Sequence, residues 1–223
     1  MWEYRYLCDV SGISEQDLEE LKQRCANCLD GERSKKLIRI KSQKAYLQSM
    51  CAGLLLQKAV QDFNGVFTSS IEKKLTFREL LTEVENGPFF DNRYVYGSGG
   101  KPYFADVPMF FSLSHSGNYV YLVCAPVEVG ADLQQMADVN YDSITNRFFA
   151  EDEKLKLNAI LDAGERKELF FRLWTKKEAY GKYTGEGIAK AVGISEGHFG
   201  DELSFETQRF DDVIISICRK AYV

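Results

Sequence analysis

The segment at residues 170–187, FFRLWTKKEAYGKYTGEG, is typical of one continuous helix whose buried side turns from apolar to charged. With 3.6 residues per turn, the apolar stripe that includes Trp174 continues into Lys177 and Glu178. Apolar stripes normally face the core, so two interpretations are open. The helix end can emerge into water, with Glu178 and Lys182 as a surface pair worth ~0.3–0.5 kcal/mol. Alternatively, the helix carries its charges into a cleft, where they meet a ligand.

The composition limits the class of protein. At 223 residues, the chain can form one large domain or two small ones. A net charge of −5 argues against a general nucleic-acid binder, because a phosphate backbone requires a basic surface. The longest apolar run, at about residues 119–127, is far shorter than the ~20 residues that span a bilayer, and the N-terminal residues lack the pattern of a secretory signal. We therefore expect a cytoplasmic protein without a membrane partner.

The spacing of two cysteines is compatible with a metal site or a redox site. Cys25 and Cys28 form a C-x-x-C motif, but there is no second cysteine pair, and the only histidines are His115 and His198. Both cysteines fall in an expected helix, which favours reduced, structural thiols. We expect the same of the other cysteines, which are Cys8, Cys51, Cys124 and Cys218.

The expected elements repeat in a similar order in the two halves of the chain. In the first half we predict strands at residues 2–10, 110–115 and 119–125, helices at 14–29 and 32–63 with a possible break near Ser42, a short helical or extended element at 76–82, and turns at 86–108. In the second half we predict a strand at 127–133, helices at 141–149, 151–162 and 165–183, and two or three C-terminal strands. This order predicts an α+β protein of two similar α/β subdomains, residues 1–126 and 127–223, packed around a cleft.

Two candidate motifs do not meet their requirements. The glycine-rich stretch at residues 97–101, GSGGK, lacks the first glycine of a P-loop and is followed by proline. Ser114 and His115 suggest a hydrolase, but neighbouring residues on a strand point to opposite faces and there is no nucleophile elbow. Donors to an anion are therefore a better interpretation of this pair.

Two carboxylates suggest a metal site. Asp132 ends an apolar strand, where alone it could equally be a turn or helix-capping residue, and Glu178 lies on the helix described above. Two converging carboxylates need a cation to be stable together. Mg²⁺ suits oxygen ligands and is often shared with substrate phosphates.

Together these motifs resemble those of a known family. The strings GKP, FSLSHSG, GADLQ, FFAEDE and FRLWTKKEAYGKYTGEGI occur in the order seen in 4′-phosphopantetheinyl transferases of the surfactin (Sfp) type, W/KEA subgroup. The family pattern W-x-x-K-E-A-x-x-K-x-x-G-x-G matches at Trp174, Lys177, Glu178, Ala179, Lys182, Gly185 and Gly187. The resemblance covers about residues 33–188 and implies that the two subdomains have a pseudo-two-fold arrangement.

The resemblance also implies an activity. Such an enzyme transfers 4′-phosphopantetheine from coenzyme A to a serine of an acyl or peptidyl carrier protein, with Mg²⁺ as cofactor, and releases 3′,5′-ADP. The implied partners are coenzyme A and the carrier protein, without nucleic acid, and a monomer is sufficient. Fatty-acid, polyketide and nonribosomal peptide carriers are all open, and the carrier is expected to bind near Arg147 and Phe149.

By resemblance, the roles of individual residues follow. Asp132 and Glu178 hold Mg²⁺, and Glu178 is the candidate general base, directly or through a metal-bound water. Lys182 and His115 stabilise the pyrophosphate and the leaving group. The residues implied to contact coenzyme A are Arg33, Lys36, Ser49, Lys101, Ser114, His115, Lys177 and Lys182. Of these, Arg33, Lys36 and Ser49 face the 3′-phosphate, in the first subdomain, and Lys101 lies near the adenine.

The sequence departs from the family at two positions. Many relatives carry a third acidic metal ligand where this chain has Gln134, so we expect Gln134 to coordinate weakly or through water and metal binding to be weaker. Gln48 stands where relatives often have arginine, which puts one phosphate contact in doubt. Two other functions stay open: a non-catalytic module that binds coenzyme A or a carrier protein, and a generic Mg²⁺-dependent hydrolase.

Overall fold

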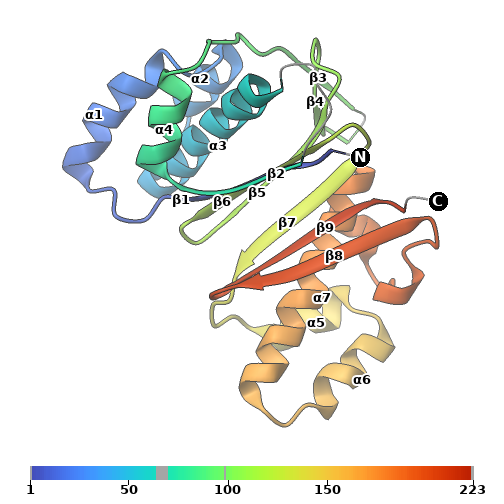
Figure 1. Cartoon of the computed structure of the whole chain (residues 1–223). Coiled ribbons are helices and arrows are strands. Elements are labelled where there is room, and N and C mark those ends of the chain that lie inside the picture. Colours follow the sequence, from blue (N-terminus) through green and yellow to red (C-terminus); the bar gives the residue numbers. More distant parts are fainter. Residues whose placement is uncertain (1, 64–69, 98, 222–223) are drawn as a thin grey trace. The chain divides into compact units, whose positions relative to one another are not determined.

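The structure is a computed structural model that describes residues 2–63, 70–97 and 99–221 (Figure 1). Its contacts divide the chain into two compact units. The first unit contains Met1–Val95 and Pro102–Pro126, and the second contains Tyr96–Lys101 and Val127–Val223. The short segment 96–101 therefore belongs to the second unit, although it lies within the first half of the sequence.

The first unit contains a four-stranded sheet in the order β2-β1-β6-β5. Strand β1 (Tyr4–Asp9) pairs in parallel with β2 (Ile71–Thr76) and antiparallel with β6 (Tyr119–Ala125), which pairs antiparallel with β5 (Phe110–Ser116). The predicted β5–β6 hairpin is confirmed. Strand β2 was not predicted, because its residues alternate only between half-buried and exposed positions and give a weak apolar pattern.

The helices of the first unit cover one side of this sheet (Figure 1). They are α1 (Glu15–Ala26), α2 (Gly31–Leu37), α3 (Gln43–Asp62) and α4 (Phe77–Glu85). Ser14 and Asp17 form a capping box that starts α1, and Ser42 caps α3, which confirms the predicted break there. The helix predicted to begin at residue 32 begins at Gly31 as α2, where the Asp30 side chain accepts a hydrogen bond from the backbone amide of Arg33.

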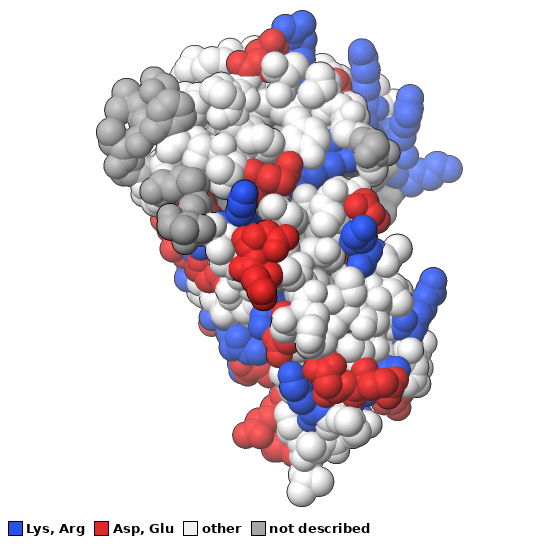
Figure 2. Space-filling view, turned by 90° about the vertical axis from the view of Figure 1, so that its right-hand side faces the viewer, with Lys and Arg blue, Asp and Glu red and all other residues white. Residues whose placement is uncertain are grey.

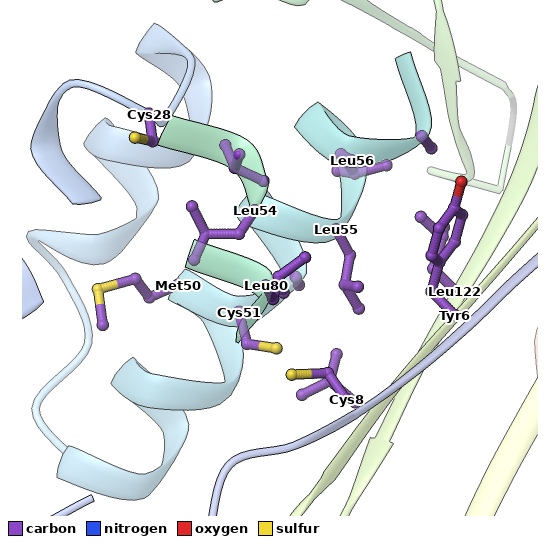
Figure 3. Packing of buried hydrophobic residues seen from close by; sticks show 14 of the residues in the cluster. Tyr6, Cys8, Cys28, Met50, Cys51, Leu54, Leu55, Leu56, Leu80 and Leu122 are labelled. Atoms are coloured by element: carbon purple, nitrogen blue, oxygen red, sulfur yellow. The ribbon is translucent and has the colours of Figure 1, made fainter. Parts of the chain in front are cut away.

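The core of the first unit lies between α3 and the sheet. Met50, Leu54 and Leu55 of α3 are buried, and Figure 3 shows the sulfur atoms of Cys8 and Cys51 pointing toward each other in this core. All six cysteines are free and buried, which confirms the expectation of structural thiols. Burial raises the pKa of the Cys25 thiol to about 12, so this group stays protonated at neutral pH.

The second unit contains a three-stranded antiparallel sheet in the order β7-β9-β8. The strands are β7 (Val129–Gln135), β8 (Leu203–Phe210) and β9 (Val213–Lys220). The helices are α5 (Tyr141–Phe148), α6 (Glu151–Ala159), α7 (Ala163–Thr184) and the 3₁₀ turns η1 (Ile188–Ala191) and η2 (Glu196–His198). Helix α7 packs mainly on β7 and β9 of this sheet, and its first part extends beyond the sheet (Figure 1).

A short hairpin of β3 (Tyr94–Tyr96) and β4 (Pro102–Phe104) forms within the segment predicted to be turns. Both units combine helices with a sheet, so the α+β class is confirmed, while the two sheets differ in strand number and order. None of the helices in the described residues is both long enough and apolar enough to cross a membrane.

Candidate active site

The site is built around Asp132, a carboxylate buried in the second unit. Asp132 lies on β7 and is only 2% exposed. The ammonium of Lys182 lies 2.8 Å from its Oδ1, and the side-chain amide of Gln134 donates to its Oδ2 at 3.1 Å. Because Asp132 and Gln134 are two residues apart on a strand, their side chains lie on the same face. The strand therefore presents one anion and one neutral amide together.

Glu178 brings a second carboxylate to this point from α7. Burial, and after it the charge of Asp132, raises the pKa of Glu178, and the nearby charge of Lys182 partly opposes this. Glu178 also lies one helical turn before Lys182, which contacts Asp132 directly. The structure thus brings Asp132, Gln134, Glu178 and Lys182 to one part of the second unit, and their roles stay predictions.

Close backbone contacts hold α7 against β7 at the level of the site. A side chain at Gly130 would place its Cβ 2.1 Å from the carbonyl oxygen of Ala179, so only glycine permits this approach. A Cβ at Gly181 would lie 2.4 Å from the carbonyl carbon of Gly187, and Gly185 ends the helix in the left-handed conformation with φ of 75°. Gly130 thus sets how far α7, with Glu178 and Lys182, stands from β7, whereas Gly181 and Gly185 shape the turn that ends α7.

The change from apolar to charged residues along α7 has a structural explanation. In the first half of the helix, Phe170 packs in a core cluster with Phe149, and Trp174 packs on Phe148 with ring centroids 5.3 Å apart. Further along, the helix lies beside β7, and its Lys182 contacts Asp132, the central residue of that strand. The same face therefore begins as core and ends at the charged site.

The residues at this site fit Mg²⁺. Among the described residues, no group of three or more His, Cys, Asp or Glu side chains is arranged to hold a metal ion. Asp132 and Glu178 offer two carboxylates, and Gln134 adds a neutral amide oxygen. Such a small set of oxygen ligands suits Mg²⁺, which keeps several waters and binds substrate phosphates. Burial is the main cause of the raised pKa of Glu178, and a cation between the two carboxylates would relieve the second cause, which is repulsion by Asp132.

Lys177 is a correction to the sequence prediction. Its side chain is fully buried, its ammonium lies 2.8 Å from the Glu153 carboxylate, and it donates to the carbonyl oxygen of Ile194. A contact between Lys177 and coenzyme A is therefore contradicted. The motif matched the residue type, but the side chain points into the second unit because its ion-pair partner lies on α6.

Lys101 joins the segment 96–101 to the rest of the second unit. Its ammonium pairs with the Glu128 carboxylate and donates to the carbonyl oxygens of Val129, at 2.8 Å, and Tyr183, at 3.3 Å. A Cβ at Gly99 would lie 1.6 Å from a backbone oxygen at the end of α7. The segment is thus held tightly at the start of β7 and the end of α7. The predicted contact of Lys101 with adenine stays a prediction.

In the first unit, three predicted residues lie together on α2 and α3. Arg33 donates to the hydroxyl of Ser49 at 3.3 Å, and desolvation followed by the charge of Arg33 lowers the pKa of Lys36. Gly53 leaves room for the aliphatic part of Arg33, which a Cβ would approach to 2.7 Å. Two neighbouring cations beside a hydroxyl favour an anion. On the face shown in Figure 2, Lys and Arg side chains form small local groups, although the chain as a whole has a net charge of −5.

The end of strand β5 carries the other predicted pair of the first unit. Ser114 is buried and His115 is exposed, as expected for neighbours on a strand. Gln48 is buried on α3, and its side-chain amide donates to the carbonyl oxygen of Gly117 at 2.9 Å. Gln48 therefore ties α3, which carries Ser49, to the turn that follows His115. This role was not apparent from the sequence, because the two segments are far apart along the chain.

Comparison with known proteins shows a similarity to one family over part of the chain. A sequence model described as the 4′-phosphopantetheinyl transferase superfamily matches residues 128–218, which include β7, α7 and the four gathered residues. These residues are therefore similar to that superfamily, in agreement with the resemblance found in the sequence. The Sfp type and the W/KEA subgroup stay predictions.

Three relatives with the name 4′-phosphopantetheinyl transferase illustrate the similarity. AcpT of Escherichia coli is 31% identical over 127 residues, which are 56% of this chain and 64% of AcpT. The psf-1 protein of Bacillus pumilus is 34% identical over 118 residues, 52% of this chain and 49% of the relative. HetI of Nostoc is 39% identical over 110 residues, 46% and 45% of the two proteins. The chain thus matches less than two thirds of the length of each of these phosphopantetheinyl transferases.

Proposed function

We propose that this protein transfers the 4′-phosphopantetheine group of coenzyme A to a serine of an acyl or peptidyl carrier protein, and that the reaction depends on Mg²⁺. The observation that carries the proposal is the buried Asp132 with Lys182 at 2.8 Å and the half-buried Glu178 beside it, all inside the matched domain. This arrangement supplies what phosphoryl transfer needs, which is positioning and charge neutralisation.

The proposed chemistry balances at the β-phosphorus of coenzyme A. The serine oxygen of the carrier forms a bond to this phosphorus, and the bond from phosphorus to the bridging oxygen breaks, so that 3′,5′-ADP leaves. The serine proton passes to Glu178, directly or through water. Lys182, with His115, neutralises the charge that grows on the leaving group.

Mg²⁺ would be held by Asp132 and Glu178, with Gln134 as a weaker ligand through its amide oxygen. When bound, it supplies Lewis-acid neutralisation of the diphosphate. Asp132 acts as the buried anchor, because its Lys182 and Gln134 partners fix the direction of its carboxylate. Lys182 is placed to keep one cation beside the phosphates.

The remaining predicted contacts complete the proposal. Arg33, Lys36 and Ser49 bind the 3′-phosphate of coenzyme A, supported by their proximity in the first unit. Ser114 and His115 contact the other phosphates. The finer assignments are also proposals: the Sfp type, a pseudo-two-fold arrangement of the two subdomains, a monomer, and carrier binding near residues 147–149.

The experiment is the mass of a carrier protein after incubation. An apo acyl carrier protein and an apo peptidyl carrier protein are each mixed with the protein, coenzyme A and Mg²⁺, and measured by mass spectrometry. We expect at least one to gain a single phosphopantetheine group, and Glu178→Ala to abolish the gain while the far-UV circular dichroism spectrum stays unchanged. Binding of coenzyme A without any gain favours a non-catalytic module. Release of phosphate without a carrier protein favours a hydrolase.

A further inference from the structure

Lys177 and Glu153 form an ion pair that is enclosed within the second unit. Both side chains are 0% exposed, and the ammonium lies 2.8 Å from the carboxylate. The ammonium of Lys177 also donates to the carbonyl oxygen of Ile194 and lies 5.4 Å and 5.6 Å from the ring centroids of Phe149 and Phe199. Fully buried lysines are rare and need such partners. The position of this cation is therefore fixed from several sides.

The Glu153 carboxylate connects three segments of the second unit. One oxygen accepts the backbone amide of Ala150 at 2.9 Å, which closes the first turn of α6. The other accepts the backbone amide of Glu196, in η2, at 3.0 Å. With Lys177 on α7 as its third partner, this single carboxylate ties α6, η2 and α7 together. The pair is thus anchored to structure outside α7.

Lys177 is followed directly by Glu178, so the ion pair of Lys177 with Glu153 also affects where Glu178 points. Successive side chains on an α-helix point about 100° apart around the axis. Holding Lys177 in its buried site therefore fixes the rotation of α7, and with it the direction of Glu178. A buried ion pair adds little net stability compared with apolar residues of similar size, but it can specify one arrangement.

We propose that Lys177 and Glu153 are positioning residues that set the rotation of α7 and so hold Glu178 beside Asp132. The inference rests on the proposed function, because it takes Glu178 to be a metal ligand. A neutral replacement of the pair would keep α7 packed but would allow it to turn. The predicted loss is therefore in metal affinity, and not in folding.

The test uses the whole 223-residue chain, with Mn²⁺ as the probe metal. Mn²⁺ affinity is measured by isothermal titration calorimetry with saturating coenzyme A, and stability by urea unfolding. Single removal of Lys177 would leave the buried Glu153 carboxylate without its cation, so the main variant is the neutral double substitution K177M/E153Q. We expect it to unfold near the wild-type urea midpoint and to bind Mn²⁺ about 10-fold or more weakly, as for outer-shell changes at other metal sites.

Lys176→Met is the matched control, because Lys176 is the neighbouring lysine on α7 and pairs with Glu196 at the surface. This control should keep the wild-type Mn²⁺ affinity. If the double variant does not fold, Glu153→Asp tests the positioning role instead, because it keeps the charge but shortens the side chain. This variant should also bind Mn²⁺ more weakly than wild type. A folded double variant, or in its absence a folded Glu153→Asp, with wild-type Mn²⁺ affinity overturns the positioning role alone. A wild-type protein that binds no Mn²⁺ refutes the metal site of the proposed function as well.

Discussion

The ion pair between Lys182 and Asp132 predicts a measurable coupling in the metal-free protein. Removing one partner of a fully buried pair costs about 3–5 kcal/mol, whereas exposed pairs contribute about 0–1 kcal/mol. Here the aspartate side chain is 3% exposed and the lysine side chain is 30% exposed. Water can therefore replace part of the interaction of the Lys182 ammonium with the Asp132 carboxylate. We expect Lys182→Met to lower the free energy of unfolding by about 2 kcal/mol, between the values for exposed and fully buried pairs.

The double-mutant cycle isolates the interaction from other effects of each substitution. Asp132→Asn should cost less than Lys182→Met, because the lysine it leaves behind reaches water. Once Asp132 is neutral, the loss of Lys182 should matter little. The coupling free energy between the two positions is expected to be about 1–2 kcal/mol.

The assay is urea unfolding followed by the fluorescence of Trp174, in the absence of divalent metal. The chain has two tryptophans, and Trp2 lies in the first unit, so a Trp2→Phe background reports the second unit alone. Trp174 packs on Phe148 and Phe170, so its emission reports loss of the packing around α7. A coupling below about 0.5 kcal/mol would refute the argument that Asp132 depends on a cation.

Three further predictions concern residues around the same carboxylates. Because the pKa of Glu178 is raised in the folded protein, its contribution to stability is lost as pH rises from the ordinary glutamate range through the raised pKa. In urea unfolding, the stability of Glu178→Gln relative to wild type should therefore increase from about pH 4 to about pH 7. A difference that stays constant over this range would contradict the prediction. Gln134→Glu should lower the Mg²⁺ concentration for half-maximal transfer, because it adds a charged ligand, and an unchanged Mg²⁺ dependence would place Gln134 away from the metal. Gly130→Ala should lower stability by about 1–3 kcal/mol through its clash with Ala179, and an unchanged thermal midpoint would show that the contact relaxes freely.

Local patterns in the sequence were sufficient for much of the fold. The turn at Gly117 between two apolar strands predicted the β5–β6 hairpin, and Ser42 marked the start of α3. Strands β2, β3 and β4 were not predicted from the sequence, because they are short or half-exposed and their apolar pattern is weak. The segment 96–101 was assigned by its place in the sequence. Its docking on the second unit depends on contacts of Gly99 and Lys101 with residues far along the chain.

The candidate site shows the same division between local and distant information. Asp132 and Gln134 share a strand face by period, so their proximity could be predicted once the strand was recognised. Lys177 was misassigned because matching a motif gives the residue type but not the direction of the side chain. That direction depends on Glu153, which lies on another helix and was not predicted to be buried.

The central claim is that Asp132 and Glu178 hold one divalent ion against the diphosphate of coenzyme A. The most direct measurement is the ³¹P NMR spectrum of coenzyme A bound to the protein while Mn²⁺ is added. We predict that the diphosphate signals broaden selectively with wild-type protein, and that Asp132→Asn and Glu178→Gln each remove this protein-dependent broadening although coenzyme A still binds. The same selective broadening in both variants would contradict the claim.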